Sequence, residues 1–129
     1  MSYVYAKADD LEGTGKVGSK QCVALLQHYA KVGNTGTWKE GKAVMGDALL
    51  SKGTAIATFV DGKYLSHGTG NHAAFYISQD AGGIWVMDQW ANDAKKPKVS
   101  KRYIRKKGKL PKGGYIDPSN NAEAYSVIE

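Results

Sequence analysis

Helical spacing of apolar residues is clearest in the first quarter of the chain. Ser19 is expected to cap a helix, and Gly33 followed by Asn34 is expected to end it. Between these ends, apolar residues stand at positions 22, 23, 25, 26, 29, 30 and 32. This spacing predicts one helix with a broad buried face, preceded by an extended or looped segment over residues 1–18.

Short β-like segments follow this helix. The stretch 37–50 is expected to be a short helix or a loop anchored by Trp38. Runs rich in β-branched, aromatic and other apolar residues then predict strands over 53–60, 72–79, 84–90 and 99–105, and a polar tail ends the chain. One helix followed by an antiparallel meander predicts an α+β fold, with the N-terminal helix packed on one face of an antiparallel β-sheet.

The composition favours a single domain spanning residues 1–129. The chain has 42% hydrophobic residues and three tryptophans, and 129 residues can bury a core without disulfides or metals. Its one cysteine, Cys22, excludes an internal disulfide and a zinc site built from several thiolates.

Neither a leader nor a membrane anchor is predicted. The first residues lack the basic start and apolar run of a signal peptide, and no apolar stretch approaches the roughly 20 residues that span a bilayer. We therefore expect no membrane insertion and no export by an ordinary cleaved leader. A leaderless secretion route, or a leader missing from the sequence, stays open.

Positive charge is concentrated in one segment. The formal net charge is +6, and residues 95–112 contain ten Lys or Arg residues and no acid. This segment predicts attraction to a polyanion, either nucleic acid, an anionic surface or an acidic cell-wall polymer. The alternative is a solvated basic edge without a specific partner.

Three residues suited to acyl transfer fall where the predicted elements can bring them together. Cys22 stands near the helix N-terminus, where the helix dipole and unpaired N–H groups favour a thiolate. A hairpin sets the start of strand 72–79 beside the end of strand 84–90, so His72 and Asp88 are candidates for a cross-strand pair in a register that the sequence does not fix. Cys, His and Asp then serve as nucleophile, base and orienting residue in acyl transfer to sulfur and hydrolysis, with the Cys22 N–H as a candidate oxyanion donor.

Each of these residues also has a structural interpretation. Cys22 can simply pack on an apolar helix face, and His72 can be a turn-capping or buried histidine. Asp88 is harder to explain in this way, because a carboxylate between apolar residues is costly without a partner. His28 competes for the base role but lies six residues from Cys22, about 240° around the helix. His67, in a glycine-rich loop, is held in reserve.

The chain resembles a known family in several segments: GSKQCVALLQ, GTAIATF with GKY shortly after it, GNHAAFYISQ, GGIWVMDQW and VSKRYIR. They are similar to segments of the type VI secretion amidase effectors, second family, which also has domesticated animal relatives. More broadly, the order of a helix-borne cysteine, a strand-borne histidine and a polar residue on the next strand resembles the NlpC/P60 and CHAP papain-like cell-wall peptidases. The resemblance covers residues from about 17 to 105.

The resemblance implies a papain-like NlpC/P60 fold and a peptidoglycan amidase or endopeptidase. It makes Cys22 the nucleophile and His72 the base, with Asp88 where relatives place an acid, an amide or a second histidine. The implied substrate is the cross-link between D-alanine and meso-diaminopimelate in peptidoglycan stem peptides, and the family uses no metal or organic cofactor.

The resemblance also implies a delivery route. Effectors of this family are injected by the type VI secretion apparatus into the periplasm of a rival bacterium, and the producer carries a cognate immunity protein. We expect the chain to be a monomer. The sequence leaves open whether it kills rivals or remodels its producer's own wall.

Substrate-binding candidates are chosen by position alone: Gln21, Trp38, Asn71, Gln89 and Trp90. The alternatives are an exposed helix position for Gln21 and core packing for the two tryptophans. The rival function is a basic module without catalysis. It would bind nucleic acid, with Tyr103 and Trp90 stacking on bases, or bind the cell wall.

Overall fold

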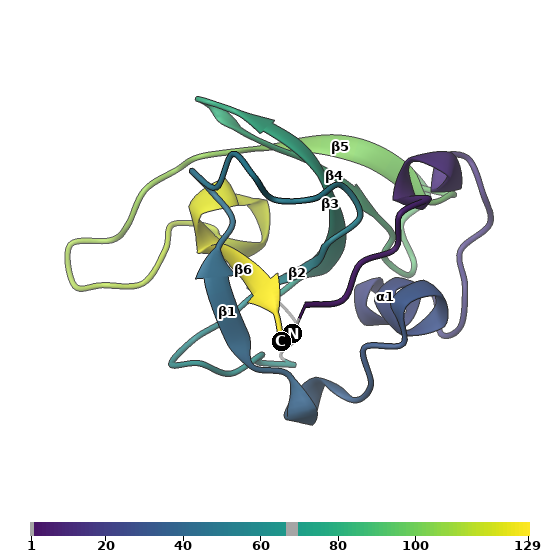
Figure 1. Cartoon of the computed structure of the whole chain (residues 1–129), viewed down its shortest axis with the longest axis horizontal. Helices are drawn as coiled ribbons and strands as arrows, with labels where there is room; N and C mark the ends of the chain where they lie inside the picture. The colour runs from purple at the N-terminus through teal and green to yellow at the C-terminus, as the bar shows by residue number, and fades with distance from the viewer. Residues whose placement is uncertain (1, 67–69) are drawn as a thin grey trace.

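One antiparallel sheet carries the α-helix on one face (Figure 1). The computed structural model describes residues 2–66 and 70–129. Its strands are β1 (Glu40–Ala43), β2 (Ala55–Thr58), β3 (Ala73–Asp80), β4 (Gly83–Asp88), β5 (Ser100–Arg105) and β6 (Tyr125–Ile128). They lie in the order β1-β6-β2-β3-β4-β5, and every neighbouring pair is antiparallel. The predicted α+β architecture is confirmed.

Helix α1 (Cys22–Ala30) forms where its apolar positions meet the sheet. Leu25 and Leu26 are fully buried in the same core cluster as Phe75 of β3. The helix begins later than expected, because its N-cap is Gln21, whose backbone is extended. The hydroxyl of Ser19 instead accepts a 3.4 Å hydrogen bond from the Gln21 N–H.

Two strands differ from the sequence-based expectation. The stretch 37–50, expected to be a short helix or loop, contains the edge strand β1. The tail, expected to be polar, ends in β6, which lies between β1 and β2. All four residues of β6 are buried, so this strand carries no alternating pattern from which it can be recognised.

Asn121 organises the tail that leads into β6. This buried side chain donates from Nδ2 to the carbonyl oxygens of Gly108 at 2.9 Å and Ile116 at 2.8 Å, and its Oδ1 accepts from the Lys107 N–H at 3.0 Å. The segment therefore folds back on itself, and the short 3₁₀ helix η3 (Pro118–Asn120) lies within hydrogen-bonding reach of β5.

The register of β3 and β4 determines which side chains meet at the end of the sheet. Tyr76 pairs with Val86, and both pack in the core cluster on the face away from α1. His72, one residue before β3, and Asp88, at the end of β4, stand at even spacing from Tyr76 and Val86, so alternation directs their side chains to this face as well. Cys22 approaches them from the N-terminus of α1.

Candidate active site

Cys22 is held in place through the segment that precedes it. Gln89 is fully buried and donates from Nε2 to the carbonyl oxygens of Gln21 at 2.8 Å and Val17 at 3.1 Å. Its Oε1 accepts from the Val17 N–H at 3.0 Å. These bonds tie the N-terminus of α1 to the chain just after β4. Position alone made Gln89 a groove-lining candidate, and the structure corrects this: the side chain is buried and positions the cysteine.

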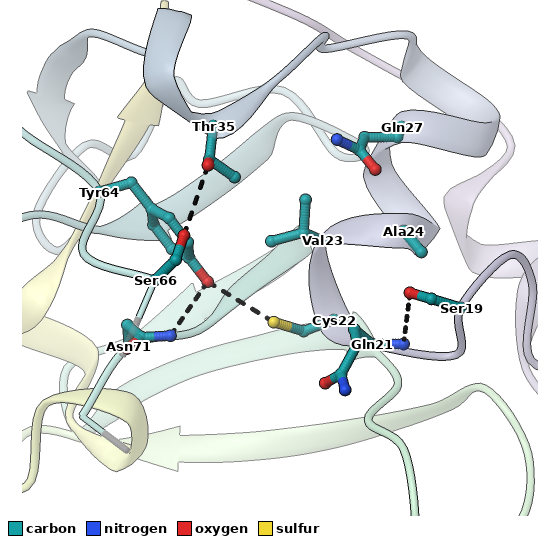
Figure 2. A pocket seen from close by; sticks show the side chains of 10 residues that line it. All are labelled: Ser19, Gln21, Cys22, Val23, Ala24, Gln27, Thr35, Tyr64, Ser66 and Asn71. Atoms are coloured by element: carbon teal, nitrogen blue, oxygen red, sulfur yellow. Dashed lines mark hydrogen bonds between the residues drawn. The ribbon is translucent and has the colours of Figure 1, made fainter. Parts of the chain in front are cut away.

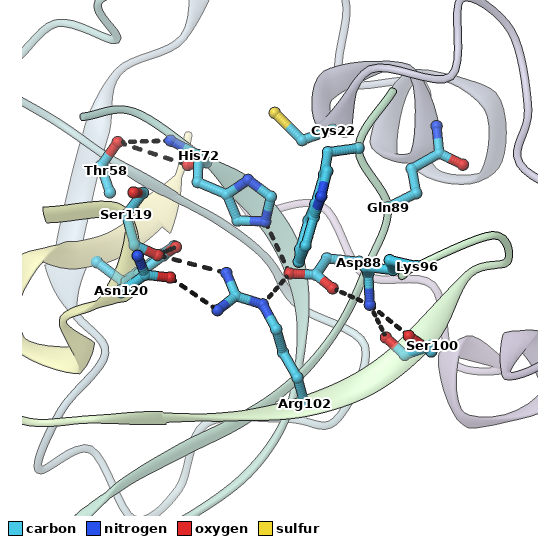
Figure 3. Close-up of polar contacts among 12 residues, drawn as sticks. Cys22, Thr58, His72, Asp88, Gln89, Lys96, Ser100, Arg102, Ser119 and Asn120 are labelled. Atoms are coloured by element: carbon cyan, nitrogen blue, oxygen red, sulfur yellow. Dashed lines mark hydrogen bonds and ion pairs between the residues drawn. The ribbon is translucent and has the colours of Figure 1, made fainter. Parts of the chain in front are cut away.

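His72 and Asp88 form the cross-strand pair that the sequence allows. His72 Nε2 lies 2.7 Å from Asp88 Oδ2, which leaves Nδ1 for the sulfur of Cys22 (Figure 3). The backbone of His72 is fixed by Thr58, whose N–H donates to the His72 carbonyl at 3.0 Å and whose hydroxyl accepts from the His72 N–H at 3.0 Å. The imidazole is therefore held at both its backbone and its far nitrogen.

Asp88 is a fully buried carboxylate that contacts three cationic side chains. Arg102 Nε donates to the same Oδ2 at 2.7 Å, and Lys96 Nζ forms an ion pair with Oδ1 at 2.8 Å. Burial raises the pKa of the Asp88 carboxyl, but the hydrogen bond and charge of His72, followed by the charges of Arg102 and Lys96, hold it well below its usual range. The carboxylate is therefore ionised wherever the fold is intact.

The Trp90 ring lies close to both permanent cations beside this carboxylate. Lys96 Nζ lies 4.8 Å from the centre of the indole ring, and the Arg102 guanidinium carbon lies 5.1 Å from it. Lys96 also donates to the Ser100 carbonyl at 3.1 Å, and its side chain is only 7% exposed. The cations therefore gain cation–π and hydrogen-bond stabilisation that offsets part of the cost of burying them.

The cluster shifts the pKa values of both candidate reactive groups. Burial raises the pKa of the Cys22 thiol, but the hydrogen bond and charge of His72, then Tyr64 and the Ala73 backbone, bring it below its usual value. Burial lowers the pKa of His72, whereas Asp88 and Cys22 together raise it, to about 9 overall. Between these two pKa values the stable form is a thiolate beside an imidazolium.

Tyr64 is the site residue that the sequence analysis leaves unassigned. Its hydroxyl lies 3.6 Å from Cys22 Sγ and accepts a 3.4 Å hydrogen bond from Asn71 Nδ2 (Figure 2). Burial, and then the charge of Cys22, raise the pKa of Tyr64, so the phenol keeps its proton and can donate. Tyr64 lies in an irregular loop between β2 and β3. The only sequence signal near it is the turn segment GKY, in which it is the last residue, and this segment does not indicate a role for the phenol.

Trp38 supports Tyr64 rather than lining the groove. Its ring is 5% exposed, lies in the core cluster and packs against Tyr64 with 5.0 Å between ring centres. The indole Nε1 donates to the Val32 carbonyl at 3.0 Å. The structure thus favours core packing, the alternative given for Trp38, over its assignment as a substrate-binding candidate.

Two cavities meet at Cys22, and both are also lined by Gln21 and Asn71. The first, of about 520 Å³, we call the Tyr64 arm; its other lining residues include Gln27, Thr35, Tyr64 and Ser66. The second, of about 430 Å³, we call the Arg102 arm; its other lining residues include His72, Trp90, Arg102 and Asn120. The sulfur therefore stands at the junction of an extended cleft.

His28, which competes for the base role, lies away from Cys22. His28 is exposed and packs edge-on against Tyr29, with 4.6 Å between the ring centres. His67 lies outside the described residues. Among the described residues, no group of three or more His, Cys, Asp or Glu side chains is arranged to hold a metal ion. No helix in the described part of the chain is long and apolar enough to cross a membrane.

The basic segment 95–112 does not form one uniform solvated surface. Lys96 and Arg102 turn towards the buried Asp88 carboxylate, and Lys107 pairs with Asp117 at 2.8 Å. Part of this positive charge therefore belongs to the candidate active site.

The comparisons with known proteins all indicate the same family. A family model described as domesticated amidase effector 2 matches residues 4–128. The chain is 57% identical over 133 residues to a type VI secretion amidase effector 2 protein of Salmonella typhi, covering both proteins completely. It is 38% identical over 121 residues to domesticated amidase effector 2 of Ixodes scapularis, covering 88% of this chain and 73% of that protein.

A solved structure agrees with these relatives. The structure of a type 6 secretion amidase effector 2 superposes with a TM-score of 0.93 at 56% sequence identity, covering 98% of this chain and 94% of that chain. The papain-like fold expected from the resemblance is thereby confirmed. The chain belongs to the family of the type VI secretion amidase effector 2 proteins and their domesticated relatives.

Proposed function

We propose that this chain is a cysteine amidase that hydrolyses amide bonds in the stem peptides of peptidoglycan. The observation that carries the proposal is the His72–Asp88 pair, 2.7 Å apart, set beside a cysteine whose pKa is lowered by that histidine. The amidase named in the relatives supports the reaction class. No metal or organic cofactor is needed for this reaction, because nucleophile, acid and base are all side chains.

Acylation begins from the ion pair. The Cys22 thiolate attacks the amide carbonyl carbon, a C–S bond forms, and the carbonyl electron pair moves onto oxygen. The Tyr64 hydroxyl and the Cys22 N–H stabilise this oxyanion. As the C–N bond breaks, Nδ1 of the His72 imidazolium gives its proton to the leaving nitrogen, and the amine departs. Asp88 holds the ring by Nε2 throughout.

Hydrolysis of the thioester uses the same groups in reverse. The neutral imidazole of His72 takes a proton from water as the water oxygen attacks the acyl carbon. The C–S bond then breaks, the sulfur leaves as a thiolate, and the ion pair is restored. Asp88 is positioned to stabilise the positive charge that returns to the ring.

The substrate and the delivery route follow from the family resemblance and from charge. The proposed scissile bond is the cross-link between D-alanine and meso-diaminopimelate, and the net charge of +6 favours contact with an anionic wall. We propose delivery by the type VI secretion apparatus into the periplasm of a target bacterium, action there as a monomeric antibacterial toxin, and a cognate immunity protein in the producer.

The rival function, a basic binding module without catalysis, is less well supported. Tyr103, a candidate for base stacking, donates its hydroxyl to Asp80 at 2.6 Å, and Trp90 lies between Lys96 and Arg102. A module that only binds also needs no buried carboxylate to hold a histidine beside a cysteine.

Replacing the nucleophile should abolish digestion. Cys22→Ser and His72→Gln should each lower the release of monomeric muropeptides from cross-linked sacculi by at least about a thousandfold, since each removes an essential group. Mass analysis of the digest also identifies the bond that is cut. His28→Gln is the matched control and should digest like the wild type. Wild-type release by Cys22→Ser contradicts the mechanism.

Activity should depend on pH with a bell-shaped profile. It should rise as Cys22, whose pKa lies below its usual value, loses its proton, and fall as His72 loses its proton with a pKa of about 9. The measurement is kcat/KM on a soluble cross-linked muropeptide, from pH values below the pKa of Cys22 to values above the pKa of His72. A profile that stays flat from strongly acidic pH to well above the His72 pKa of about 9 would rule out a functional ion pair.

Removing the Tyr64 hydroxyl should slow the chemical step. Tyr64→Phe should lower kcat by roughly 10²- to 10³-fold, as expected for the loss of one oxyanion donor, with little change in KM. The acidic limb of the pH profile should also move to higher pH, because this hydroxyl helps to lower the pKa of Cys22. Tyr103→Phe, which removes a hydroxyl bound to Asp80 instead, is the control. An unchanged kcat in Tyr64→Phe excludes the role.

A further inference from the structure

We propose that the Arg102 arm is a subsite for a carboxylate carried by the amine half of the scissile amide, an inference that rests on the proposed amidase function. Arg102 is then a specificity-determining residue as well as a partner of Asp88.

The chemistry assigns the two halves of the substrate to the two arms. A general acid must lie within hydrogen-bonding reach of the atom it protonates, so the leaving nitrogen must lie beside His72. His72 lines the Arg102 arm. The oxyanion belongs to the acyl half, and the donor Tyr64 lines the Tyr64 arm. The amine half therefore extends into the Arg102 arm and the acyl half into the Tyr64 arm (Figures 2 and 3).

The two arms differ in charge. Among the described residues, none that lines the Tyr64 arm is Asp, Glu, Lys or Arg. The described residues that line the Arg102 arm include the Arg102 guanidinium and no acid. The negative charge of the nearby Asp88 carboxylate is not available to Arg102 only, because Asp88 also contacts His72 at 2.7 Å and Lys96 at 2.8 Å. With His72 protonated and Cys22 ionised, two anions face three cations, so the arm still presents surplus positive charge to the substrate.

The guanidinium also has the geometry to receive an anion. Arg102 uses Nε for Asp88, one N–H of Nη1 for Asn120 Oδ1 at 3.0 Å, and one N–H of Nη2 for the Ser119 carbonyl at 3.4 Å. Each terminal nitrogen carries a second N–H. The side chain is 23% exposed and lines the cleft, so a ligand bound there is within reach of the guanidinium. The three existing contacts hold the guanidinium in one orientation before any ligand arrives, which reduces the ordering cost of binding.

This subsite selects one kind of amine half. In this kind of amine half, the carbon attached to the scissile nitrogen bears a free carboxylate. That negative charge then lies close to His72 and within the Arg102 arm. The diaminopimelate half of a peptidoglycan cross-link has this arrangement. A substrate with the same carboxyl converted to a carboxamide loses the ionic contact and leaves the cation unpaired. Neutralisation of that carboxyl should therefore protect a substrate from cleavage.

The test uses two pairs of synthetic branched peptides. The first pair differs only in a carboxylate or a carboxamide on the amine half, next to the scissile nitrogen; the second pair carries the same change on the acyl half. We expect wild-type kcat/KM to favour the amine-half carboxylate roughly 10- to 100-fold, as for a charge-assisted hydrogen bond, and to change little for the acyl-half pair. In Arg102→Gln, the ratio of kcat/KM between the carboxylate and the carboxamide substrates of the first pair should fall towards one, whatever the absolute rate of this variant.

Binding to the wild type provides a measurement that needs no variant. The free amine product with its carboxylate should inhibit the wild-type enzyme competitively at a lower concentration than its carboxamide does. Cys22-dependent cleavage without preference for the amine-half carboxylate overturns this inference and leaves the amidase intact. Absence of any Cys22-dependent cleavage overturns the proposed function itself. A preference that Arg102→Gln retains in full also contradicts the assignment to Arg102.

Discussion

The ion cluster around Asp88 is the interaction on which the site depends. A carboxylate with no exposed surface is stable only with partners, and here it has three cationic ones, from the residue just before β3, from β5 and from the loop between β4 and β5. The same contacts that make its burial tolerable hold the His72 ring in place and stabilise its protonated form. That positive charge in turn stabilises a thiolate at Cys22. The reactivity of the Cys22 sulfur therefore depends on the Asp88 carboxylate, which does not touch the sulfur and acts on it through His72.

The fold brings these groups together by joining segments that are distant in sequence. Gln89, next to Asp88 in the chain, hydrogen-bonds the backbone at Gln21, so β4 positions both the orienting carboxylate and the helix N-terminus. Trp38 packs behind Tyr64 and fixes the phenol whose hydroxyl faces the sulfur. Displacement of any one of these buried supports shifts a reactive group. Residues outside direct contact with substrate should therefore matter as much as those that line the cleft.

The sequence made His72 and Asp88 candidates for a cross-strand pair, because a hairpin sets their segments side by side, but it did not fix the register that brings the side chains together. Asp88 carried the stronger signal, since a carboxylate in an apolar run is costly without a partner, whereas Cys22 and His72 also had structural interpretations. The α+β architecture followed from the order of the elements. The edge strand β1 and the buried strand β6 did not, because four-residue segments carry too few positions to show a period.

The structure differs from the sequence-based expectation mainly in the residues around the site. The role of these residues depends on three-dimensional contacts, which the sequence pattern does not show. Lys96 and Arg102 looked like members of a solvated basic run, yet both face a buried acid. Gln89 and Trp38 looked like groove residues and are buried supports. Tyr64 had no distinguishing neighbours in sequence, because its loop approaches Cys22 only in three dimensions.

The most direct test of this account is the pH dependence of Cys22 alkylation by iodoacetamide, in the wild type and in Asp88→Asn, below the melting temperature of each folded protein. The wild-type rate should titrate with a midpoint below the value of about 8.5 for a free thiol. In Asp88→Asn the midpoint should move to higher pH, because the imidazolium loses its stabilising carboxylate. A wild-type midpoint at or above that of a free thiol, or the same midpoint in both folded proteins, would contradict the account.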